Sequence, residues 1–166
     1  MPRQTVLRRA IILSLVVVGL NAEPAHAALT LTTDHRSVSF GLMQLDEEKT
    51  LAEQGSFHNQ ITCASTGGRL WYLKIHVLQP LTAGAETVPL EAFKWAVTTP
   101  NGKGNVAHSN QLTPFNVVPD LVYISGANEA AGTTVTFQFR YSLKVPSAQL
   151  TGVYNTTIRF TFTEIL

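Results

Sequence analysis

The sequence has very little cysteine and little charge. Cys63 is the single cysteine among 166 residues, so no disulfide can form within the chain. Charged residues make up 14%, and 12 Lys and Arg against 11 Asp and Glu give a formal net charge of +1. A near-neutral chain has no electrostatic basis for binding nucleic acid or an anionic membrane. Its stability must therefore come from apolar packing, for which 45% hydrophobic residues provide the material.

Patterns of catalytic and metal-binding residues are also missing. On the predicted strands no His, Asp or Glu pair has the two-residue spacing of strand-borne metal ligands, and neither G-x-S-x-G nor S-x-x-K occurs. Cys63 falls on the apolar side of its strand, which indicates a buried, inert thiol. Gly102-Lys103-Gly104 resembles part of a phosphate loop, but it lacks the preceding strand and is predicted to be a turn. We therefore expect no enzyme, no cofactor and no metal site, and we interpret the histidines as surface residues: His35, His58, His76 and His108.

The N-terminus has the three parts of a secretory signal peptide. Arg3, Arg8 and Arg9 form a basic segment, residues 10–20 are apolar, and Ala25-His26-Ala27 is a small-x-small cleavage site. The apolar run is too short to span a bilayer. We expect residues 1–27 to be removed and the protein to be exported to the periplasm, the cell surface or the extracellular space. Residues 28–166 then form one domain with nine Lys and Arg and ten Asp and Glu, from totals of 12 and 11.

Apolar and polar residues alternate strictly in two long segments near the C-terminus. In residues 135–143 the odd positions, from Val135 to Leu143, are apolar or aromatic. In residues 154–162 the apolar positions are Tyr154, Ile158, Phe160 and Phe162. A period of two predicts strands with one buried face and one solvated face, and the turn residues between the segments predict an antiparallel pair.

Shorter runs with the same period occur throughout the chain. The bulkiest has Trp71, Leu73, Ile75 and Val77 on its inner face. Residues 44–56 are predicted to be either a helical turn or a solvated loop or edge strand, and residues 99–119 a long loop. About eight or nine short strands predict an all-β fold, an antiparallel immunoglobulin-like β-sandwich of Greek-key type, with a closed barrel as the alternative. Three aromatic residues are candidates for exposure: Tyr72, Phe115 and Tyr123.

The end of the chain resembles that of exported bacterial surface β-sandwiches. Val145-Pro146, Gly152-x-Tyr154 and the alternating strand with Phe160-Thr161 are similar to the end of WxL cell-surface domains, and Trp71-Tyr72-Leu73 is a literal W-x-L. The second motif of that family falls near residues 160–162, where this chain has F-T-F. The resemblance implies binding to cell-wall polysaccharide through a motif that includes Trp71 and Leu73. The same ending resembles fimbrial and spore-coat-U-like subunits.

These features lead to two expectations for function. The first is a non-enzymatic, exported structural or adhesion-type subunit of the cell surface, which associates with itself or with other envelope proteins by exchanging strands. The second is a WxL-like module that binds cell wall or glycan. Leu29–Thr33, which is free just after cleavage, is the candidate for the donated strand, and the alternative is that it pairs within its own domain. Candidate strand-exchange residues lie at both ends of the domain: Leu29, Leu31, Tyr154, Ile158, Phe160 and Phe162.

Overall fold

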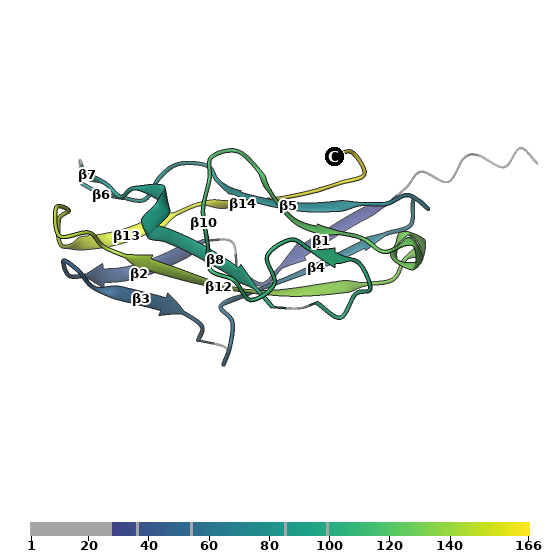
Figure 1. The fold of residues 1–166 in the computed structure, drawn as a ribbon, viewed down its shortest axis with the longest axis horizontal. Coiled ribbons are helices and arrows are strands. Elements are labelled where there is room, and N and C mark those ends of the chain that lie inside the picture. The colour runs from purple at the N-terminus through teal and green to yellow at the C-terminus, as the bar shows by residue number, and fades with distance from the viewer. Residues whose placement is uncertain (1–27, 36, 54, 85, 99) are drawn as a thin grey trace, which may run out of the picture.

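The computed structural model describes residues 28–166 except 36, 54, 85 and 99, and the predicted signal peptide lies outside the described residues. The described chain is all-β, as predicted, with fourteen strands and two short 3-10 helices, η1 (Leu90–Ala92) and η2 (Ala127–Ala131) (Figure 1). All pairs between the named strands are antiparallel.

The strands form three sheets. The first has the order β1 (Leu29–Thr33), β4 (Asn59–Ser65), β12 (Val135–Lys144), β8 (Phe93–Val97) and β10 (Thr113–Pro114), and β3 (Glu48–Leu51) pairs with the second half of β12. The second has the order β14 (Ile158–Thr163), β5 (Tyr72–Val77), β11 (Asp120–Ile124) and β9 (Asn105–Val106). The third has the order β2 (Val38–Met43), β13 (Gly152–Thr156), β6 (Thr82–Ala83) and β7 (Glu86–Thr87).

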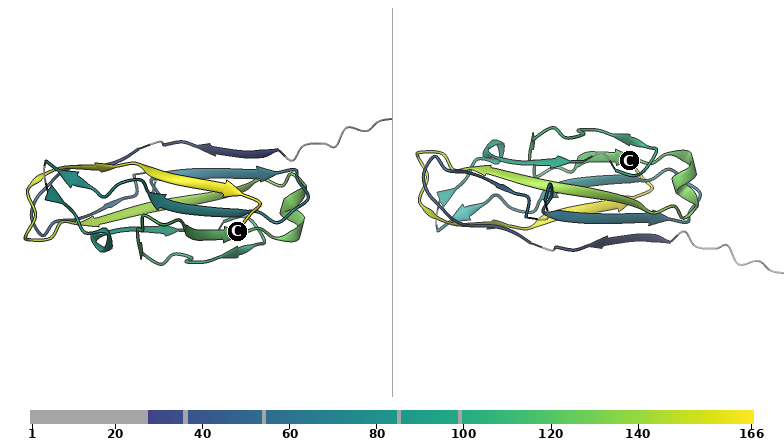
Figure 2. Two further views of the ribbon diagram at one scale, coloured as in Figure 1. Left: turned by 90° about the horizontal axis from the view of Figure 1, so that it is seen from above. Right: turned by 90° about the horizontal axis from the view of Figure 1, so that it is seen from below.

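The first and second sheets stack as the two layers of a sandwich. Seen from above, β14, β5 and β11 face the viewer, and seen from below β12 and β4 do, with β1 along one side in both views (Figure 2). Aromatic rings join the layers: the Phe139 and Phe160 ring centroids are 5.0 Å apart, and Trp71 meets Phe137 edge-on at 6.4 Å. Within the second sheet, Trp71 also meets Phe162 edge-on at 4.9 Å. Alternation along each strand therefore supplies the two apolar faces that form the core.

The structure differs from the sequence prediction in several details, beginning with fourteen described strands where about eight or nine were predicted, two of them, β9 and β10, inside the predicted loop 99–119. Residues 154–162 form two strands instead of one, because the chain changes partner at Thr157, from β2 to β5. The charged segment 44–56 contains edge strand β3, so the helical turn is wrong; Lys49 Nζ donates to the Phe40 carbonyl at 2.6 Å. Tyr123 and Phe115 are buried, and only Tyr72 of the three aromatic candidates is partly exposed.

A buried carboxylate organises the Gly102-Lys103-Gly104 segment. Glu129 is 2% exposed, and it accepts hydrogen bonds from the Lys103 and Gly126 amides and from the Tyr123 hydroxyl. A Cβ at Gly104 would overlap the Ile124 carbonyl oxygen, so the backbone approaches β11 more closely than any other residue type permits. Gly102 and Gly104 therefore allow this loop to pack closely against its neighbours.

We expect Gly104→Ala to lower the free energy of unfolding by about 2 kcal/mol or more, because the added methyl group meets rigid backbone. Gly126→Ala is the control, since its Cβ would lie 3.3 Å or more from its neighbours. Urea denaturation followed by tryptophan fluorescence measures both. Equal effects of the two substitutions would contradict the steric explanation.

Candidate functional site

Two strands at the edges of different sheets face each other along one side of the sandwich. β14 pairs with β5 from Ile158 opposite Val77 to Thr163 opposite Tyr72, and no described strand pairs with its other edge. β1 pairs with β4, and its other edge is likewise without a partner among the described strands. The closest Cα atoms of β1 and β14 approach within 8 Å. The sandwich is therefore open between its first and last strands.

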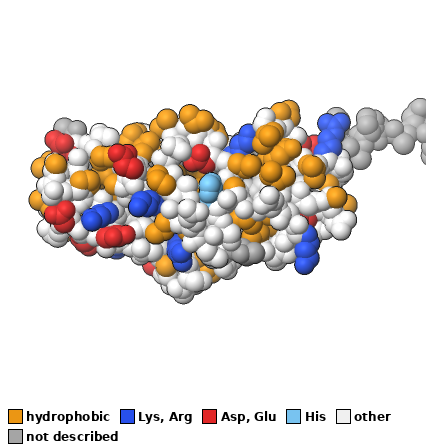
Figure 3. Space-filling view, viewed as in Figure 1, with side chains coloured by type: hydrophobic (Ala, Val, Ile, Leu, Met, Phe, Trp, Pro, Cys, Tyr) orange, Lys and Arg blue, Asp and Glu red, His pale blue; other side chains and the backbone are white. Residues whose placement is uncertain are grey.

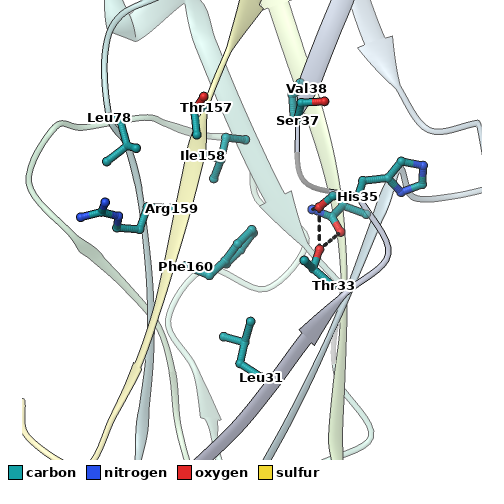
Figure 4. Close-up of a pocket in the computed structure, with 11 residues that line it drawn as sticks. Leu31, Thr33, His35, Ser37, Val38, Leu78, Thr157, Ile158, Arg159 and Phe160 are labelled. Carbon is teal, nitrogen blue, oxygen red and sulfur yellow. Dashed lines mark hydrogen bonds between the residues drawn. The ribbon is translucent and has the colours of Figure 1, made fainter.

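A groove of about 390 Å³ lies between these two edges. Leu31 of β1 and Ile158 and Phe160 of β14 point into it, whereas the Arg159 side chain points away from its centre (Figure 4). Val38 and Leu78 complete its apolar lining. The groove thus combines apolar side chains with two edges whose backbone groups have no strand partner.

The side chains of β14 are covered less well than those of the neighbouring strand on the same face. Leu73 and Ile75 of β5 are fully buried, at 0% exposure. Ile158, Phe160 and Phe162, whose register partners on β5 are Val77, Ile75 and Leu73, are only partly buried. The difference arises because β5 has strands on both sides and β14 has a strand on one side.

Polar groups hold the chain where it leaves β1 for β2. Thr33 Oγ1 lies 2.6 Å from the His35 carbonyl oxygen and 2.9 Å from Asn59 Oδ1 (Figure 4). Asn59 is 3% exposed, and its Nδ2 lies 3.4 Å from the Tyr141 hydroxyl. Burial raises the pKa of that hydroxyl. The hydrogen bond with Asn59 lowers this pKa and the charge of nearby Asp34 raises it, both by less than burial does. Tyr141 therefore stays protonated, and Asn59 links the crossing segment to the core.

Two histidines meet beside this crossing. The His35 and His58 ring centroids are 4.8 Å apart, and His58 Nδ1 lies 2.6 Å from Glu53 Oε2. Burial disfavours the ionised form of Glu53, but the hydrogen bond from His58 and the charges of both histidines outweigh it, so the pKa of Glu53 is lowered. Within the described ranges no three His, Cys, Asp or Glu side chains gather as a metal site would require.

The structure brings together half of the candidate strand-exchange residues. Leu31, Ile158 and Phe160 line the groove. Leu29 lies at the outer end of β1 with 41% exposure, Phe162 packs on Trp71, and Tyr154 is buried in β13 with its hydroxyl on the Leu150 carbonyl. Thr33 and His35 also line the groove and were not predicted; the break in alternation at residues 34–35 was their signal in the sequence.

The W-x-L tripeptide is part of the core. Trp71 and Leu73 are both 0% exposed, and the Trp71 indole N–H donates to the Glu129 carbonyl at 3.3 Å. Neither side chain is available to a ligand in this structure. Cys63 is buried, as predicted, and burial raises the pKa of its thiol to about 12.

No family model, curated protein or solved structure matches this chain. Among the described residues, no helix has the length and apolar character needed to cross a membrane.

The Glu53–His58 contact should make a small contribution to stability that depends on pH. Because the pKa of folded Glu53 is lowered, the contribution is present above its unfolded pKa and is lost as the pH falls through the folded pKa. We expect Glu53→Gln to lower the free energy of unfolding by about 0.5 kcal/mol at pH 7 and to have no effect near pH 3. Urea denaturation at both pH values, with Glu91→Gln as the exposed control, tests this. An equal effect at both pH values would contradict it.

Proposed function

We propose that this protein is an exported, non-enzymatic structural subunit of the cell surface that assembles by strand exchange. In this assembly, Leu29–Thr33 of one copy pairs with the free edge of β14 in the next copy. The observation that supports the proposal is that β14 has one strand partner and partly exposed apolar side chains along a groove. An unpaired edge with an apolar face favours the addition of another strand.

Two features make β1 suitable as the donor strand: its alternation of side chains and its pairing along a single edge. Leu29, Leu31 and Thr33 share one face of β1, and the core-facing residues of β14 have the same period of two. β1 is held by β4 along one edge, and two of its five residues are partly buried while three are exposed. In the structure β1 pairs within its own chain, which is the state of the free subunit under this proposal.

The distance between β1 and β14 means that a subunit can accept a strand along β14 only if it releases its own β1. A strand placed between β1 and β14 needs about 9–10 Å, twice the distance between neighbouring strands, and the two approach within 8 Å. β1 must therefore leave before another strand can pair along β14. A subunit that accepts a strand thereby releases its own, and such head-to-tail contacts generate open chains.

We expect the protein purified after export to show a mass that rises with concentration in light scattering. Deletion of residues 28–34 should abolish this association by removing the donor strand. Ile158→Lys should weaken it at least tenfold by placing a charge in the groove, whereas Val118→Lys, at a position that is 68% exposed and does not line the groove, should not. A monomer at every concentration, or equal effects of the two lysine substitutions, would overturn the proposal.

Hydrogen exchange locates the contact without any substitution. In the monomer we expect the amides of residues 158–163 to exchange faster than those of β5, because one edge of β14 is open. Assembly should slow their exchange. Assembly that leaves exchange in β14 unchanged would show that a different surface forms the contact.

A further inference from the structure

The outer face of the second sheet carries a continuous row of polar and basic side chains. Leu73, Ile75 and Val77 of β5 point into the core, so Tyr72, Lys74 and His76 point outward. Their register partners on β14 are Thr163, Thr161 and Arg159, in that order. We call the residues Tyr72, Lys74, Arg159, Thr161 and Thr163 the outer strip. The two strands that carry it, β5 and β14, face the viewer in the left panel of Figure 2.

The two cations of the outer strip have no carboxylate partner. Neither Lys74 nor Arg159 forms an ion pair within 4.0 Å among the described residues. Two acidic residues lie nearby: Asp120 is opposite Ile75 on β11, with its Oδ2 accepting from Asn116 at 2.9 Å, and Glu164 follows β14, with its Oε1 accepting from Ser65 at 3.1 Å. Neither carboxylate forms an ion pair with Lys74 or Arg159.

Lys74 and Arg159 are close enough to contact two neighbouring anionic groups of one ligand. Lys74 is opposite Thr161, so Arg159 is its diagonal neighbour across the strand pair, about 7–8 Å away. His76 lies within β5 opposite Arg159 and is 9% exposed, so the prediction of a surface histidine is wrong for this residue. Burial, followed by the charge of Arg159, lowers the pKa of His76, so the imidazole is neutral at neutral pH and the cationic charge of the strip lies on Lys74 and Arg159.

Charge is distributed differently at the end of the molecule formed by β2, β3 and β13. There basic and acidic side chains are interspersed on the face shown in Figure 3. A hollow on the outer face of the first sheet likewise contains both Lys94 and Lys144 and both Glu48 and Glu91. The outer strip therefore differs from these two regions in that none of its own five residues is acidic.

We propose that the outer strip binds an anionic polysaccharide. Lys74 and Arg159 contact its carboxylate or sulfate groups, the hydroxyls of Thr161 and Thr163 hydrogen-bond to sugar hydroxyls, and the half-buried Tyr72 ring offers a flat apolar surface to a sugar ring. Two cations on a near-neutral domain are too few for the phosphate backbone of a nucleic acid. The outer strip adjoins the proposed assembly contact: Arg159 lines the rim of the groove, and its side chain points away from the centre of the groove (Figure 4).

The test measures binding of the protein purified after export to polygalacturonate and to dextran sulfate at low salt, with neutral dextran for comparison. We expect binding to one or both polyanions and not to dextran, and weakening as salt is added. The double substitution Lys74→Gln and Arg159→Gln should lower affinity at least tenfold, because each cation contributes a charge-assisted hydrogen bond. Tyr72→Leu should lower affinity without changing the salt dependence.

A double substitution on the other sheet provides the matched control. Lys94→Gln with Lys144→Gln changes the net charge equally and should leave affinity unchanged. Equal losses in the two double variants, equally tight binding to duplex DNA, or no binding to either polyanion would overturn the proposal. Preference for polygalacturonate or for dextran sulfate identifies the anionic group. Repeating the measurement with residues 28–34 deleted separates this site from assembly, because that variant loses the donor strand, retains the outer strip and gains no charge beside Arg159.

Discussion

The packing of aromatic side chains between two sheets is the interaction on which this fold depends. The chain has a single cysteine, which is buried, so no disulfide joins the layers. Trp71 is at the centre of this packing, in ring contact with Tyr123 of its own sheet, Phe137 of the opposite sheet and Phe162 of the last strand. Because its indole N–H also reaches the Glu129 carbonyl, the same residue links the core to η2. The stability of both edge strands follows from this core.

The proposed assembly surface results from where the second sheet ends. β14 contributes Ile158, Phe160 and Phe162 to the core, but none of the described strands pairs along its outer edge to finish covering them. β1 approaches this edge without pairing with it, since it belongs to the other sheet through β4. The apolar groove and the unpaired edge therefore have one cause, and a single added strand would satisfy both.

Both proposed surfaces include β14. The assembly contact uses its edge and its inner face, and the outer strip uses its outer face. In β14 the even-numbered residues point toward the core and the groove. The odd-numbered residues, Arg159, Thr161 and Thr163, face solvent beside β5. Assembly would use the edge and the half-buried apolar residues, whereas polysaccharide would contact Arg159 and the threonines outside. A subunit of this kind can form a polymer and still present the outer strip of every copy to a ligand.

The sequence by itself determined three things: its local period predicted the strand class and the inward residues, and its single cysteine excluded a disulfide within the chain. Trp71, Leu73, Ile75 and Val77, and the row from Val135 to Leu143, are buried as alternation predicted, because a strand sends successive side chains to opposite faces whatever its partner. Tertiary structure alone decided which strands pair. It divided residues 154–162 at Thr157, joined Leu31 to Ile158 and Phe160 across the groove, and placed Lys74 next to Arg159 without a carboxylate. Pairing depends on contacts between distant segments, and the alternation within one segment does not encode them.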